Sequence, residues 1–493
     1  MSLKGKKFSI KFAAFLLLAI FAAFIMTLSV YGDSWLVPWH DEVVIVRLAQ
    51  NLAEGKGFRN DLIGDLLFGA DEKTYWQMPL YPFALSLWVK IFGFDLNSVR
   101  AFSRIVGLFS LLLLTLLCRN LNLPFGATSL AVLWTASDLT FQFASNFARP
   151  DALTGCLLLL TAVLLSTRLH ESVFGSALIG LVLALAVFNH PIALPCWFVG
   201  FAIVVKRSSW RNGLAFCFPM AIFFSLWLWY VIGGWEIFIA QMKAHFSHKQ
   251  YSLTDTLVFL LGSTAWGIEF YLGIPLNAML WFVPVAITAY TALREKWLVP
   301  RWLFTFAFVL YVVAMAGAEA WYPSLFVPFG YLMLASFFDH LLRKTGSKFG
   351  RLFIATLALL WWSYQVSVVA RHLSAVPKIR LQVSNFVSEL ESLLPPKAKV
   401  FIGSFSPDPT FALMVKRPDV KVYALMPSRM INADALKRLR NQLTHLLVLK
   451  EATVVEPLLG GDEIRRWKFD FGGLSRDNVT EVVLLSAKGG ATQ

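Results

Sequence analysis

Long stretches of sequence without a single charged residue set the strongest limit on how this chain can fold. Residues 12–30, 105–118 and 352–370 are three such stretches. They reach or approach the roughly 17 to 25 residues that an α-helix needs to cross a bilayer. Hydrophobic residues make up 57% of the 493 residues and charged residues 15%, whereas soluble globular domains are about 45 to 50% apolar and about 25% charged. The sequence therefore predicts a polytopic α-helical membrane protein.

Positive charge is concentrated in short loops between the apolar segments. The formal net charge is +14, from 44 Lys and Arg residues against 30 Asp and Glu residues. Positive loops mark the cytoplasmic side of a membrane protein, so this excess indicates topology and not binding to nucleic acid. The basic clusters fall on alternate loops, at 119, 168, 206–211, 294–301 and 343–351.

Each interval between these clusters holds enough apolar sequence for two crossings. A further span at the N-terminus has a long apolar run and no small-residue cleavage site, so we expect it to be retained and not removed as a signal peptide. The pattern predicts about eleven crossings, with the N-terminus in the cytoplasm and the C-terminus outside. The ten later spans are 104–118, 126–143, 152–167, 173–189, 191–205, 213–233, 272–292, 302–318, 322–338 and 352–370.

Two external segments and the C-terminal region lack the pattern of membrane spans. Residues 33–103 form a long external loop whose apolar pieces, like those of 234–271, are expected to lie at the membrane interface. From about residue 378 the composition is that of a soluble domain, in which helix-like runs alternate with short strand-like runs. These runs are 383–394 and 433–443 for helices, and 399–403, 420–423, 446–449 and 479–485 for strands. We expect a transmembrane catalytic domain over 1–371 and a small extracytoplasmic α/β domain over 372–493.

Two adjacent acidic residues, Asp41 and Glu42, follow the first span. Carboxylates are costly to desolvate, so an acidic pair at the mouth of a helical bundle favours a functional role. Capping of the helix that follows is an equally simple interpretation, because Asp is favoured at helix N-caps. The same two interpretations apply to Asp151, which follows Pro150.

Several short motifs occur in an order that resembles GT-C superfamily glycosyltransferases, in which an acidic residue opens the helix of the first external loop. The motifs cover most of the membrane portion, at 41–42, 47–58, 78–82, 91–93, 99–104, 148–153 and 321–328. The chain is most similar to users of polyprenyl-phosphate sugars: protein O-mannosyltransferases, aminoarabinose transferases of lipid A, and lipopolysaccharide-core transferases of the RgtA/B/C/D type. It departs from the family at Trp321, where an Arg is usual, and at His190, where a Lys is frequent.

The resemblance implies a GT-C-like fold and an inverting transferase that takes its sugar from a membrane-anchored phosphate. Such a reaction needs a base for the acceptor hydroxyl, and Asp41 is the expected one, with Glu42 and Asp151 as the other catalytic candidates. Donor groups must also stabilise the departing polyprenyl phosphate. The candidates for this role are Arg149, His190, Lys243, Lys73 and Tyr322.

Some assignments stay open at the level of sequence. Asp151 either orients the acceptor or binds Arg149, and His190 fits equally well as a histidine that only satisfies a backbone carbonyl. No metal or other cofactor is expected, because His245 and His248 lack an acidic or cysteine partner nearby and the four cysteines lack ligand spacing.

A transporter or flippase of lipid-linked sugars is the rival function, and a scaffold without catalysis is a third possibility. Transporters tend to place charge at mid-membrane and to show related halves. Here the notable charges gather at one surface and the halves do not repeat. The resemblance also implies a bacterial inner membrane and a lipid, glycan or protein acceptor.

Overall fold

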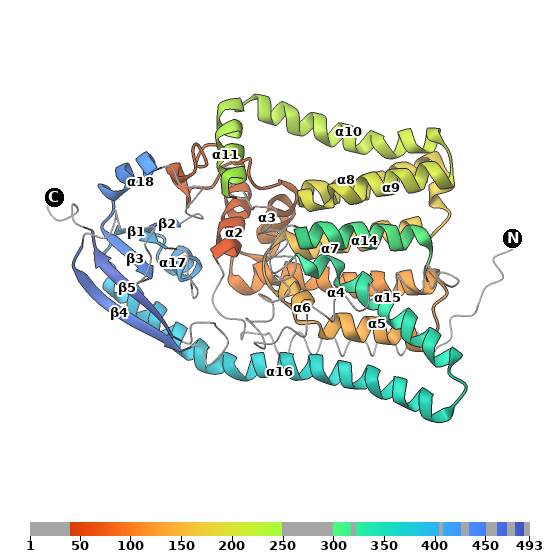
Figure 1. Cartoon of the computed structure of the whole chain (residues 1–493). Coiled ribbons are helices and arrows are strands. Elements are labelled where there is room, and N and C mark those ends of the chain that lie inside the picture. The colour runs from red at the N-terminus through yellow and green to blue at the C-terminus, as the bar shows by residue number, and fades with distance from the viewer. Residues whose placement is uncertain are drawn as a thin grey trace.

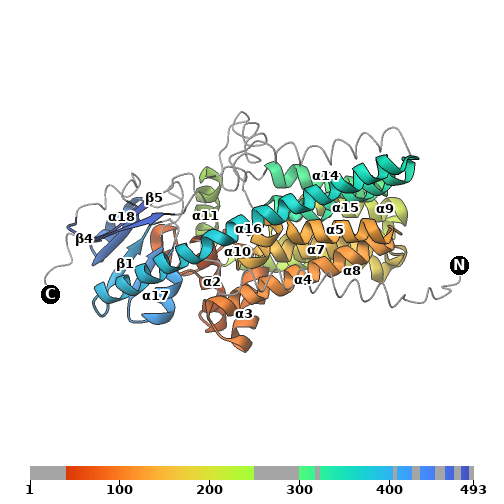
Figure 2. The same ribbon diagram turned by 90° about the horizontal axis from the view of Figure 1, so that it is seen from below.

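The chain folds into a helical bundle and a five-stranded sheet that meet at one end of the bundle (Figure 1). The computed structural model describes residues 40–248, 299–316, 322–403, 408–424, 433–449, 461–470 and 479–487. The expected spans at 12–30 and 272–292 lie outside these ranges, as does Trp321. The predicted junction at 371/372 falls inside one helix, α16 (Lys348–Leu393), which runs along the bundle and continues to the sheet (Figures 1 and 2).

Nine helices and the first part of α16 build the described part of the bundle, and three more helices lie at the end where the sheet docks. The bundle consists of α4 (Leu96–Asn120), α5 (Phe125–Ser137), α6 (Leu139–Asn146), α7 (Pro150–Leu165), α8 (Val173–Asn189), α9 (Leu194–Arg207), α10 (Trp210–Ile232), α14 (Arg301–Ala316) and α15 (Pro323–Lys344). The sheet end carries α2 (His40–Ala53), α3 (Leu80–Phe92) and α11 (Trp235–His248). Short 3-10 turns lie at η1 (Gly64–Leu66), η2 (Leu169–Glu171) and η3 (Pro191–Ala193).

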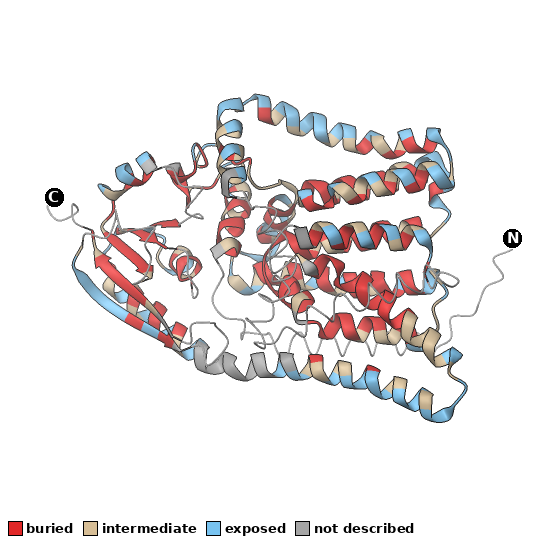
Figure 3. Ribbon diagram, in the orientation of Figure 1, coloured by how far each residue is buried: buried red, intermediate tan, exposed pale blue. Residues whose placement is uncertain are grey.

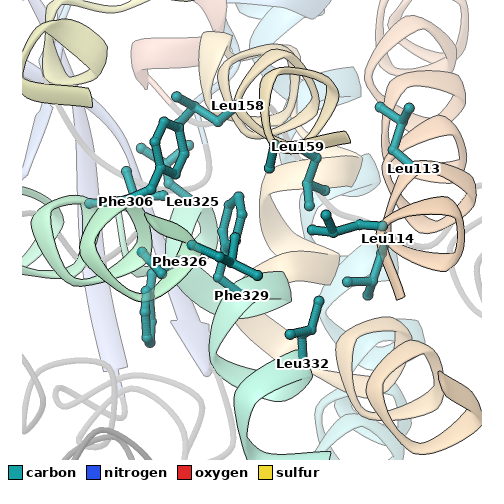
Figure 4. Packing of buried hydrophobic residues seen from close by; sticks show 14 of the residues in the cluster. Leu113, Leu114, Leu158, Leu159, Phe306, Leu325, Phe326, Phe329 and Leu332 are labelled. Atoms are coloured by element: carbon teal, nitrogen blue, oxygen red, sulfur yellow. The ribbon is translucent and has the colours of Figure 1, made fainter. Parts of the chain in front are cut away.

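Branched aliphatic and aromatic side chains fill the bundle interior (Figure 4). Leucines of α4 and α7 meet aromatic and aliphatic residues of α14 and α15, and these contacts hold the central helices together. At α8 and α10 the backbones come closer still, because Gly180 has no side chain. A β-carbon there would lie 2.0 Å from the Phe216 carbonyl oxygen. Small residues at helix interfaces are typical of packing in membranes.

The apolar surface of α10 agrees with a lipid environment. Most of its outer face is exposed (Figure 3), including Phe218 at 63% and Trp229 at 77%. In water such a face would be a large uncovered hydrophobic patch. Lipid is therefore the natural neighbour of this helix.

Span lengths differ from the simple sequence pattern. Within the described residues, three helices are long and apolar enough to cross a membrane, or four if the bent pair α6 and α7 counts as one span. Several others, such as α5 and α8, are apolar but have only 13 and 17 residues. The expected total of about eleven crossings is thus not confirmed.

A break at Asp138 divides the expected span 126–143 into α5 and α6. Asp138 has an extended backbone, and its carboxylate accepts hydrogen bonds from the Thr140 and Phe141 amides, which caps α6. The Tyr331 hydroxyl donates to the other carboxylate oxygen at 2.8 Å. These bonds satisfy the polar groups at the break, so one expected helix becomes two.

The sheet has the strand order β2-β1-β3-β5-β4. The strands are β1 (Lys399–Ile402), β2 (Lys421–Ala424), β3 (His445–Leu449), β4 (Glu463–Asp470) and β5 (Val479–Ser486), with α17 (Thr410–Lys416) and α18 (Ala433–Arg440) between them. β1 pairs in parallel with β2 and β3, whereas β5 is antiparallel to β3 and β4. The small α/β unit expected from the sequence is present.

Helix α2 is packed between this sheet unit and the bundle (Figure 1). Val43 belongs to a core that also contains strand residues, and Val44 packs in a second core with Phe401 of β1. The Ala424 amide of edge strand β2 donates to the Leu62 carbonyl at 2.8 Å. Helix α2, the segment that follows it and the sheet unit therefore form one packed body.

Candidate functional site

Asp41 and Glu42 occupy the first turn of α2, at the sheet end of the bundle. The residues that follow them, 43–46, are all buried. Acidic side chains are stabilised at a helix N-terminus by the helix dipole. Because α2 is packed on both sides, the positions of its two carboxylates are fixed by the surrounding structure.

Glu42 is completely buried and its two carboxylate oxygens are both engaged. Arg100 of α4, only 1% exposed, donates to them through Nε at 2.9 Å and Nη2 at 2.7 Å. The Ala148 amide donates to the first oxygen at 2.8 Å. The Arg100 guanidinium also lies 4.8 Å from the centroid of the Phe147 ring. This pair joins α2, α4 and the turn before α7.

Arg149 connects the other two acidic residues. Its Nη1 donates to Asp41 Oδ2 at 2.7 Å, and its Nε donates to Asp151 Oδ2 at 2.9 Å. The side chains of Arg149 and Asp151 are 7% and 1% exposed, whereas that of Asp41 is 43% exposed. One guanidinium thus binds two carboxylates, and of these two Asp41 is the one exposed to solvent.

Asp151 lies inside the first turn of α7, and the N-cap position belongs to Arg149. The sequence left open whether Asp151 orients the acceptor or binds Arg149, and the structure shows the contact with Arg149. The start of α7 is also fastened to the end of α8, because the Asn189 side chain donates to the Pro150 carbonyl and to Thr154 Oγ1, both at 2.7 Å.

His190 and Tyr322 lie together at the same end of the bundle. Their rings meet edge to face with centroids 5.1 Å apart. His190 Nδ1 accepts a hydrogen bond from the Ile192 amide at 3.2 Å, which caps η3. His190 therefore has a structural partner in the backbone, and it follows Asn189, which holds α7.

Lys73 and Lys243 belong to a corner formed by α10, α11 and the segment that links α2 to α3. Lys73 Nζ donates to the Gly233 carbonyl at 2.6 Å and lies 5.7 Å from the centroid of the Tyr230 ring. Gln241 of α11 donates to the Lys73 carbonyl at 2.8 Å. Lys243 lies on the same helix and is exposed.

Arg100 and Asn189 are site residues that the sequence did not single out. The available signal was a polar or charged side chain in an otherwise apolar helix, which requires a partner. Within the described ranges, no three His, Cys, Asp or Glu side chains are placed to hold a metal ion.

Solved structures show which fold this is. ArnT from Cupriavidus metallidurans bound to undecaprenyl phosphate matches 98% of this chain and 99% of its own, with a TM-score of 0.52 and 14% identity. The archaeal oligosaccharyltransferase AglB from Archaeoglobus fulgidus, in complex with an inhibitory peptide and a dolichol-phosphate, matches 90% of this chain and 70% of its own, with a TM-score of 0.52 and 11% identity.

The mycobacterial arabinofuranosyltransferase AftD matches 97% of this chain and 42% of its own, with a TM-score of 0.50 and 12% identity. No protein-family model matches the sequence, and no curated protein does. The chain therefore has the fold of GT-C glycosyltransferases, as the sequence motifs predicted.

Proposed function

We propose that this protein transfers a sugar, with inversion, from a polyprenyl-phosphate donor to a lipid, glycan or protein acceptor on the outer side of a bacterial inner membrane. One observation carries the proposal: on a GT-C fold, Asp41 is the exposed member of a buried carboxylate and guanidinium group at the sheet end of the bundle. Two similar structures contain lipid phosphates, undecaprenyl phosphate in ArnT and dolichol-phosphate in AglB.

Asp41 is the proposed base. Its carboxylate is 43% exposed, so an acceptor hydroxyl can reach it, and Arg149 holds one of its oxygens at 2.7 Å. The base removes the hydroxyl proton while the oxygen attacks the anomeric carbon, and the phosphate leaves from the opposite face. Glu42 has both oxygens engaged, so we assign it the role of anchoring α2.

The departing phosphate needs donor groups that are not already used by the carboxylates. Arg149 is engaged with Asp41 and Asp151, and we assign it to orienting the base. His190, Tyr322, Lys73 and Lys243 are the proposed phosphate or sugar contacts, because all four lie on segments at the same end of the bundle.

A lipid-linked sugar transporter would also use such a bundle, and transporters place charges near mid-membrane. Asp138 is a buried carboxylate between two helices of this bundle, and its hydrogen bonds to the α6 amides and Tyr331 account for it as a cap. That structural explanation leaves transfer as the better proposal.

The test is sugar transfer in proteoliposomes, with a panel of polyprenyl-phosphate sugars as donors and membrane extract as acceptor. Asp41→Asn keeps the size of the side chain and should abolish turnover while the protein stays folded. The control is Asp71→Asn in the same external loop, which should retain wild-type turnover. Full activity of Asp41→Asn would refute its role as base. Movement of the lipid-linked sugar across the bilayer without transfer would support the transporter.

A further inference from the structure

A small cavity lies beside the Asp151 carboxylate, between α4, α6, α7 and α15. Its polar lining consists of Ser110, Ser145, Asp151 and Ser324, and apolar and glycine residues complete it. The cavity is separate from the exposed face of Asp41, because Asp151 and Ser324 are only 1% and 4% exposed.

Two buried polar atoms at this cavity have no hydrogen-bond partner in the described part of the chain, Asp151 Oδ1 and Ser324 Oγ. Asp151 uses its other oxygen for Arg149. Buried polar groups in proteins almost always have a partner, either in the protein or in an ordered water molecule. Asp151 Oδ1 and Ser324 Oγ are therefore the two atoms at which a further partner can bind in this cavity.

The size of the cavity limits what can occupy it. Its volume is about 10 Å³, which corresponds to roughly one water-sized sphere. A sugar, a phosphate or an organic group is too large. The lining offers a carboxylate acceptor and several hydroxyls, and Ser110 donates to the Val106 carbonyl at 3.0 Å, so its oxygen can still accept. A buried water molecule needs about two to four such partners.

We propose that the cavity binds one ordered water molecule that bridges Asp151 Oδ1 and Ser324 Oγ. We also propose that Ser324 is a positioning residue for Asp151 and, through Arg149, for Asp41. The water completes the chain of contacts from α15 through Asp151 and Arg149 to Asp41. Ser324 follows Tyr322 by two residues, and the Tyr322 ring contacts His190. The same segment of α15 thus reaches both the carboxylates and the proposed phosphate contacts.

A high-resolution structure of the full-length protein in a lipid nanodisc tests the water site directly. Density for one water within hydrogen-bond distance of both Asp151 Oδ1 and Ser324 Oγ is the expected result. A cavity without density, or a direct bond between the two side chains, would overturn the proposal. This readout does not depend on any transferase activity.

The positioning role rests on the proposed function and is tested by kinetics. Ser324→Ala should lower kcat by about 10-fold or more with little change in KM, by analogy with the roughly 10- to 100-fold losses that follow mutation of residues that orient metal ligands. Ser324→Thr keeps the hydroxyl and should recover most of the lost kcat. The matched control is Ser336→Ala on the same helix, since Ser336 is equally buried and, among the residues that the structure describes, bonds only the Leu332 carbonyl.

Each kinetic outcome has one meaning. Wild-type kcat in Ser324→Ala, or equal losses in Ser324→Ala and Ser336→Ala, would refute the positioning role. If the wild-type protein transfers no sugar, the proposed function fails, and the density still decides whether the water site exists.

Discussion

Removing the buried carboxylate of Glu42 should destabilise the protein far more than removing an exposed carboxylate near the other end of α2. In Glu42→Ala, Arg100 would keep its charge at 1% exposure without the anion beside it. Breaking a buried ion pair in this way costs about 3 to 5 kcal/mol. The Ala148 amide would also lose its acceptor, which costs about 1 to 3 kcal/mol for a buried donor. The two losses share one carboxylate and overlap, so we expect roughly 3 to 6 kcal/mol.

The assay is thermal unfolding of the full-length protein in detergent, followed by tryptophan fluorescence and checked by size-exclusion chromatography. Glu54→Ala is the control, because Glu54 pairs with Lys56 at 38% and 43% side-chain exposure. An exposed pair contributes about 0 to 1 kcal/mol, so this variant should unfold close to the wild type.

A second substitution separates the loss of the ion pair between Glu42 and Arg100 from the loss of packing by the Glu42 side chain. Glu42→Ala combined with Arg100→Met removes both charges and should be more stable than Glu42→Ala alone. Equal unfolding temperatures for Glu42→Ala and Glu54→Ala would refute the reasoning. The reasoning would also be refuted if the double variant lost as much stability as Glu42→Ala and Arg100→Met together, because coupled partners do not behave additively.

Two further predictions concern the segment between α2 and α3 and the packing of α8 against α10. Burial raises the pKa of Asp61, but the hydrogen bond and charge of Arg47 outweigh it and lower this pKa from 3.8 to about 2. Such a carboxylate stabilises the fold above its unfolded pKa and loses this effect as pH falls through the folded pKa. Wild-type stability should therefore drop between about pH 4 and pH 2, and Asp61→Asn, measured by acid unfolding, should flatten this drop. Gly180→Val should sharply reduce the yield of folded protein, since a side chain there collides with the Phe216 carbonyl. Gly126→Ala is the control and should not reduce the yield, because no atom lies within 4 Å of a β-carbon at that position. Equal yields of the two variants would contradict this prediction.

The fold could be predicted from the sequence where one pattern dominated. The strands β1, β2, β3 and β5 are short runs of branched and aromatic residues, and each was expected. Strand β4 was missed, because charged residues make up most of Glu463–Asp470 and its outward face resembles a loop. Its charges are compensated by neighbours such as Glu389 and Glu481, which only the folded sheet brings close.

The candidate site was predictable only in part, for the same reason. The motifs indicated Asp41, Arg149 and Asp151 and their common side of the membrane. They could not indicate that Glu42 would face Arg100, because these residues are 58 positions apart and their contact depends on how α2 meets α4. Apolar content alone also concealed the break at Asp138, where a single side chain redirects the backbone.

The position of α2 has a consequence for the order in which the protein is made. This helix is made well before the sheet, yet the surfaces that cover it include strand residues at and beyond position 400. At about 5 to 20 residues per second, its apolar face waits tens of seconds for Phe401 and the strands that follow. Helix α2 is therefore covered only after the sheet has been made, and a chain that terminates before the sheet would leave the helix that carries Asp41 without this support.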